Sequence, residues 1–154
     1  MQAATQVLRD LHIEYQVLIS SAHRTPDVTS AHVKEAEVSG CGVFICGAGM
    51  AAHLAGAVAA HTTRPVIGVP LEAGGLGGLD ALLSTVQMPG GIPVASVAVG
   101  KAGAVNAAYL AAQILALNDT KLATALQELR SQNAAAIARQ NISLQDELRE
   151  GSGS

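Results

Sequence analysis

The stretch Gly42-Val43-Phe44-Ile45-Cys46-Gly47 is a run of apolar residues between two glycines. A strand that is apolar at every position is typical of a parallel sheet covered by helices on both faces. Outward from it, hydrophobic periodicity predicts further strands at 13–20, 65–70 and 93–99, and helices at 1–11, 26–39, 50–62, 79–87, 102–117 and 119–141. This alternation predicts an α/β domain with three layers, α/β/α, around a parallel sheet.

The composition excludes several classes of protein. Apolar residues make up 49% of the 154 residues and charged residues 14%, which is enough apolar surface for a core and argues against disorder. The net charge is −3 and aromatic residues are 2%, so we expect no nucleic-acid partner. No apolar run reaches the roughly 18–20 residues of a membrane span, and the start of the chain has no signal-peptide pattern. The sequence therefore predicts a soluble, cytoplasmic protein with no membrane partner.

Small side chains suggest that the domain associates with copies of itself. The chain has 16 glycines and is rich in alanine, and small residues bury little apolar area within one subunit. Leu122, Leu126, Leu129 and Ile137 lie broadly on one side of the helix expected at 119–141. We expect one domain over residues 1–150, with this helix packed on a neighbouring subunit. The final Gly-Ser-Gly-Ser places a linker-like tail at 151–154.

A first candidate site follows the strand expected at 13–20. Residues 20–27 read Ser-Ser-Ala-His-Arg-Thr-Pro-Asp, and the last three form a helix start with a Thr cap and Pro at the first helical position. Arg24 beside free helix amides suits a phosphate, and His23 can move a proton near neutral pH. The alternative is that His23 and Arg24 only cap or solvate a turn.

A second candidate site follows the strand at 42–47. Gly47, Gly49 and Ala52 satisfy the dinucleotide pattern G-x-G-x-x-[GA], and Glu72 ends the next strand, so a dinucleotide site is an alternative function. His53 lies at the start of the following helix, where it is either a packed residue or part of a ligand site. His12, His32 and His61 have no comparable setting. No Cys or His spacing typical of a metal site occurs, and no metal is expected.

Five segments in the same order resemble one enzyme family. Residues 21–27, 47–56, 66–70, 85–93 and 100–104 are similar to those of the 5-(carboxyamino)imidazole ribonucleotide mutases, the PurE family, and the match runs from Met1 to about Leu126. The resemblance implies a flavodoxin-like sheet, a homo-octamer and no cofactor. It also implies an isomerase of purine biosynthesis. Such an enzyme moves a carboxylate from the exocyclic nitrogen of an aminoimidazole ribotide to ring carbon four, through decarboxylation, retention of the CO2 and recarboxylation.

The resemblance also assigns roles to single residues. Arg24 matches the phosphate-binding Arg of the family and His23 its proton-transfer His, while Ser21 and Ala22 line the same loop. His53 is implied to face this pocket as a second catalytic residue, and it is typical of the branch that uses the carboxyamino ribotide. The substrate-binding loop that encloses the carboxylate and CO2 is implied to contain Ala48, Gly49 and Leu54.

The chain departs from the family pattern at two places. Ala55 stands where the family usually has Pro, which loosens the loop but removes no reacting group. The family begins with an apolar strand and a Gly-Ser-x-Ser-Asp loop, whereas residues 1–4 match the helix that follows them. We therefore expect a gap in the sheet and weak or absent activity of this chain. The alternative function is a catalytically inactive or engineered assembly subunit of the same fold.

Overall fold

The computed structural model describes residues 1–151, and it divides into two compact units. The first unit is Met1–Leu115, and the second begins at Ala116. The expectation of a single domain over residues 1–150, with its last helix on a neighbouring subunit, stays a prediction.

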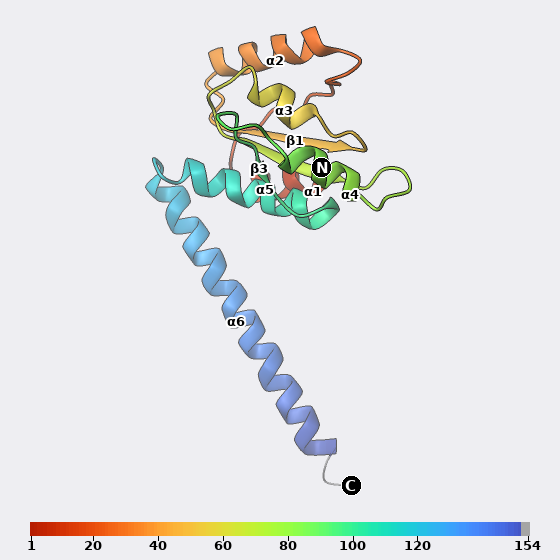
Figure 1. Cartoon of the computed structure of the whole chain (residues 1–154). Helices are drawn as coiled ribbons and strands as arrows, with labels where there is room; N and C mark the ends of the chain where they lie inside the picture. The colour runs from red at the N-terminus through yellow and green to blue at the C-terminus, as the bar shows by residue number, and fades with distance from the viewer. Residues whose placement is uncertain (152–154) are drawn as a thin grey trace. The chain divides into compact units, whose positions relative to one another are not determined.

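The first unit is built on a parallel sheet of three strands (Figure 1). The strands β1 (Phe44–Gly49), β2 (Val66–Leu71) and β3 (Ala95–Ser96) follow one another in space in chain order. Cys46 lies opposite Gly68 in the first pair of strands, and Gly68 lies opposite Ser96 in the second. Parallel strands need a crossover between them, and helices supply both crossovers here.

Helices cover both faces of this sheet, which confirms the α/β/α architecture. On one face, α1 (Gln2–Asp10) and α5 (Gly100–Leu115) contribute Leu8 and Ala108 to a cluster with Ile67 and Val69 of β2. On the other face, α3 (Leu54–Ala59) packs on β1 and β2 around Cys46, and α2 (Pro26–Val38) packs on α3. Figure 1 shows α2 and α3 above the sheet and α5 below it.

Small residues set the spacing of these layers. Six glycines and alanines of α5 are buried, and a Cβ on Gly103 would collide with the backbone carbonyl of Ala98. On the other face, α4 (Leu79–Val86) lies so close to β2 that the Thr85 methyl group fills the space beside Gly68. The high glycine and alanine content therefore serves close packing within the subunit.

The prediction of a strand at residues 13–20 is wrong. Residues 14–20 make no hydrogen bond to any strand of the described backbone. The segment contains the strand-forming residues Val17, Leu18 and Ile19, and the Ile19 side chain is 97% exposed. A strand exists only where a neighbouring strand pairs with its backbone groups. The side of β1 away from β2 has no partner among the described residues, and β1 is half-buried where β2 is buried almost throughout. The segment remains unpaired and largely exposed.

Several element bounds also differ from expectation. The helix predicted from residue 50 begins only at Leu54, and Met50 has a φ of 57°, which lies outside the helical range. The strand predicted over 93–99 pairs only at Ala95–Ser96. The helix at 26–39 is confirmed as α2, and Gly40 follows it with a φ of 87°, as expected of a residue that ends a helix.

The second unit is a single long helix, α6 (Thr120–Gly151). The Asp119 carboxylate accepts hydrogen bonds from the backbone N–H groups of Lys121 and Leu122, at 3.0 and 3.1 Å, and so caps its first turn. The helix runs past the predicted end at 141, because neither Gly nor Pro interrupts residues 120–150. The tail expected at 151–154 is helical at its first residue, and 152–154 lie outside the described residues. Of the helices described, α6 included, none is long and apolar enough to cross a membrane.

Candidate functional site

The loop that carries His23 is closed by hydrogen bonds between its two ends. The Thr25 hydroxyl accepts from the backbone N–H of Ser21 at 2.9 Å and donates to the Ser21 carbonyl at 3.1 Å. The Thr25 backbone N–H donates to the same carbonyl at 2.9 Å. Thr25 is the N-cap residue of α2 as expected, but its side chain makes no capping hydrogen bond, because the hydroxyl is used to close this loop. The closed loop holds His23 at an exposed position just before α2.

A second loop, between β1 and α3, carries His53. Ala52 is buried, and the His53 backbone N–H donates to the Ala51 carbonyl at 2.8 Å. These contacts hold the backbone that leads up to a solvent-exposed imidazole. His53 is also the N-cap residue of α3, and its side chain makes no capping hydrogen bond. The imidazole is therefore free of the helix and available to another group.

The two imidazoles meet, although thirty positions separate them in the chain. His23 Nε2 lies 2.7 Å from His53 Nδ1, within hydrogen-bond distance. The rings are arranged edge to face, with centroids 4.8 Å apart and planes at 76°. We call His23 and His53 the histidine pair. The sequence interpretation that these two residues share a site is consistent with this contact, and the pair offers two titratable rings at one exposed place.

Arg24 and Ser21 lie beside the histidine pair on the same loop. The Ser21 hydroxyl accepts from the backbone N–H of Arg24 at 3.2 Å and from its Nε at 3.5 Å. The guanidinium is exposed and makes no ion pair with a described carboxylate, so it can bind an anion. Ala22 lies between Ser21 and His23, half-buried. His23 and Arg24 therefore lie at adjacent positions of one closed loop, and their joint action on one ligand stays a prediction.

The other predicted loop residues lie near the end of β1. Ala48 and Gly49 are its last two residues. A Cβ on Gly49 would lie 2.7 Å from the Cβ of Ala73, so packing alone requires this glycine, one of the two in the dinucleotide pattern. Leu54 begins α3 and packs against the cluster around Cys46. Its side chain therefore supports the loop from the core side.

A cavity that the sequence did not reveal lies at the carboxyl end of β2. It has a volume of about 700 Å³, and its lining includes Met1, Leu71, Glu72, Gly100 and Lys101. Glu72 and Lys101 provide charges of opposite sign there. Neither residue of the histidine pair lines this cavity. The sequence offered a signal for Glu72 as a lining residue, because it directly follows a buried strand. Lys101 is brought to the cavity only by the fold.

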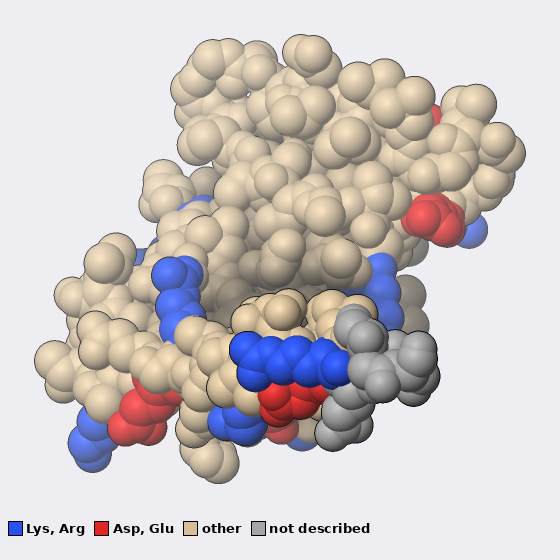
Figure 2. Space-filling view, turned by 90° about the horizontal axis from the view of Figure 1, so that it is seen from below, with Lys and Arg blue, Asp and Glu red and all other residues tan. Residues whose placement is uncertain are grey.

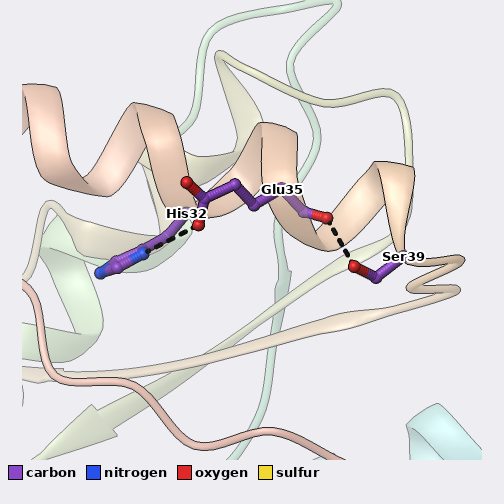
Figure 3. A network of polar contacts seen from close by, with 3 residues as sticks. All are labelled: His32, Glu35 and Ser39. Atoms are coloured by element: carbon purple, nitrogen blue, oxygen red, sulfur yellow. Dashed lines mark hydrogen bonds and ion pairs between the residues drawn. The ribbon is translucent and has the colours of Figure 1, made fainter.

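His32 and Cys46 take part in other contacts. His32 is on α2, where its Nδ1 lies 3.8 Å from the Glu35 carboxylate, and Ser39 donates to the Glu35 carbonyl at 2.9 Å (Figure 3). Cys46 is buried in the core, and burial raises its pKa to about 12. It is therefore a packing residue with no reactive thiolate near neutral pH. No group of three metal-binding side chains occurs among the residues described.

Comparison with known proteins identifies the fold and its relatives. The family model described as AIR carboxylase matches residues 1–136. The chain belongs to the AIR carboxylase family. This match covers the sheet, both loops of the histidine pair and the first half of α6.

Three relatives of this chain are named N5-carboxyaminoimidazole ribonucleotide mutase. That of Bacillus subtilis is 50% identical over 137 residues, which is 89% of this chain and 85% of the relative. That of Escherichia coli K12 is 51% identical over 130 residues, 84% of this chain and 77% of the relative. That of Saccharolobus solfataricus is 50% identical over 128 residues, 83% of this chain and 80% of the relative.

The fold also matches a solved structure. The crystal structure of Treponema denticola PurE superposes with a TM-score of 0.81 at 30% sequence identity, covering 90% of this chain and 85% of that one. The flavodoxin-like α/β fold expected from the resemblance is confirmed by this match.

Proposed function

We propose that this protein is a 5-(carboxyamino)imidazole ribonucleotide mutase, an isomerase of purine biosynthesis that needs no metal or organic cofactor. The observation that carries the proposal is the histidine pair beside Arg24 on a closed, exposed loop. Relatives that are about half identical over most of their length and bear this name support it.

The reaction needs an anchored phosphate and a proton that moves twice. Arg24 provides a permanent cation for the phosphate of an aminoimidazole ribotide. When the bond from the exocyclic nitrogen to the carboxyl carbon breaks, its electron pair returns to that nitrogen, which takes a proton from the imidazolium form of His23, and CO2 is released. Ring carbon four then bonds to the CO2 and gives its proton to the neutral His23 imidazole, so the imidazolium is restored. His53 completes the pair, and Ser21, Ala22, Ala48, Gly49 and Leu54 form the surrounding loops.

Turnover of the carboxyamino ribotide tests this function. Purified chain is mixed with the substrate, and the carboxylate at ring carbon four is followed by 13C NMR of label placed on the carboxyl group. The proposal expects the label to move from nitrogen to carbon faster than in buffer, and a His23→Asn, Arg24→Ala double variant to abolish the gain. Label that appears only as free CO2 and bicarbonate would refute the mutase. It would favour the alternative of an inactive assembly subunit.

Self-association into a homo-octamer is part of the same proposal. The α4 residues Leu79, Leu83 and Val86 recur at helical spacing and are each about half exposed or more. In the view of Figure 2, Lys and Arg side chains lie next to Asp and Glu side chains and do not gather into a separate basic patch, which argues against a nucleic-acid partner. Native mass spectrometry would show eight chains. A Leu83→Lys variant should shift the mass to smaller species, with the exposed-loop variant Leu76→Lys as its control. The cytoplasmic location stays a prediction.

A further inference from the structure

The contact between the histidine rings constrains where their protons lie. A hydrogen bond between His23 Nε2 and His53 Nδ1 holds one proton. If that proton is on His23 Nε2, then neutral His23 has none on Nδ1, and His53 carries its own proton on Nε2. If the proton is on His53 Nδ1, then both rings carry their protons on Nδ1. In a neutral pair the two rings therefore have the same tautomer.

The contact also decides which nitrogen of His23 meets the substrate. Nε2 is engaged with His53, so Nδ1 is the nitrogen left to exchange a proton. We propose that His53 is a positioning residue, which holds His23 by Nε2 so that Nδ1 performs both proton transfers. This inference rests on the proposed mutase function. It adds the reacting atom and a role for His53 that the sequence did not supply.

The position of His53 makes this role specific. His53 is the first residue of the turn that begins α3, and its backbone is fixed by the buried Ala52 and by the hydrogen bond to Ala51. His23 is held by the Ser21–Thr25 bonds on the other side. Both rings therefore start from anchored backbones, and the 2.7 Å contact joins two separate loops. Loss of the contact would free the ring of His23 to rotate without unfolding either loop.

Two substitutions at position 53 separate a positioning role from a direct one. His53→Asn places a side-chain amide near the position of Nδ1 and lacks any atom at Nε2. His53→Ser cannot reach His23. Both residues are favoured at helix N-caps, so the start of α3 is matched in the two variants. If His53 acts through His23, the His53→Asn variant should keep kcat within about 10-fold of the parent, and kcat of the His53→Ser variant should fall about 100-fold. KM should stay within a few-fold in both.

Ring tautomers give a readout that does not depend on activity. The full chain is labelled with 15N-histidine, and the two-bond 15N–1H spectrum reports which nitrogen of each ring is protonated. We expect one shared tautomer for His23 and His53, and a change at His23 in His53→Ser. A His61→Asn variant should leave both rings and turnover unchanged.

Opposite tautomers on His23 and His53 would overturn the inference. Equal losses of kcat in the His53→Asn and His53→Ser variants would also overturn it. Absence of turnover in the parent chain would remove the mutase function. The tautomers would still decide whether the rings are linked.

Discussion

The methyl group of Thr85 occupies the space that a side chain on Gly68 would need. A Cβ added to Gly68 would collide with that methyl group and would also lie 3.1 Å from Val94. Gly68 is in the middle of β2, where the strand backbone is rigid, and Thr85 is tied to α4 by a hydrogen bond from its hydroxyl to the Ala81 carbonyl at 2.7 Å. The contact sets the distance between α4 and the sheet.

Gly68→Ala should therefore destabilise the protein. We expect a loss of about 1–3 kcal/mol in the free energy of unfolding, the usual cost of overpacking, measured by urea denaturation. Gly75→Ala is the matched control, because a Cβ there meets nothing within 4 Å. It should change the free energy by no more than about 0.5 kcal/mol. Equal stability of the two variants would contradict the close packing of α4 on β2.

His23→Asn should affect turnover far more than binding. The substitution removes the proton-transfer group, so we expect kcat to fall by a factor on the order of 100 or more, with KM for the ribotide within a few-fold. The measurement is steady-state kinetics with the carboxyamino ribotide, with His32→Asn as the control on α2. Unchanged kcat would remove His23 from the mechanism.

Arg24→Ala should affect binding of the ribotide more than turnover, the reverse of the effect of His23→Asn. A charged hydrogen bond to phosphate is worth roughly 1.5–3 kcal/mol, so KM should rise by about 10- to 100-fold. Arg24→Lys keeps the charge but loses the planar fork, and it should recover part of the affinity. Isothermal titration with the product ribotide checks both values. Affinity of Arg24→Ala equal to that of the parent would show that the phosphate lies elsewhere.

Burial of Cys46 should make stability fall at alkaline pH. Its pKa is raised from 9.0 to about 12 by desolvation first and by Cys41 second. Between these values the unfolded chain has lost the thiol proton and the folded chain still holds it, so stability is present below about pH 9 and is lost as the pH rises towards 12. Cys46→Ala should flatten this decline relative to Cys41→Ala in urea denaturation at pH 8 to 11. If the free energy of unfolding falls with pH equally steeply in both variants, burial of Cys46 is not the cause of the decline.

The open edge of β1 should be visible in hydrogen exchange. The Phe44 N–H donates to the Pro65 carbonyl at 2.9 Å, and alternate residues of a strand point their N–H groups to the same side. We therefore expect slow exchange at Phe44, Cys46 and Ala48, and fast exchange at Ile45 and Gly47, by NMR. Residues 14–20 should exchange fast throughout. Protection of Ile45 and Gly47 would mean that another strand covers this edge.

The sequence by itself determined the local elements and the chemistry of their loops. The apolar run at 42–47, the Thr-Pro-Asp start of α2 and the glycine at 40 act over a few residues, so their outcome can be inferred from the chain alone. The presence of an imidazole beside a guanidinium at 23 and 24 is equally local.

Only the tertiary structure decided which of these parts meet. The segment 13–20 has the residues of a strand but stays unpaired, because pairing depends on a neighbour that sequence pattern cannot supply. The helix α3 begins only at Leu54, which places His53 at its N-cap. The approach of His23 to His53 depends on two loops thirty residues apart, each fixed by its own hydrogen bonds and burial. Such contacts arise from packing of the whole unit, which no short stretch of sequence encodes.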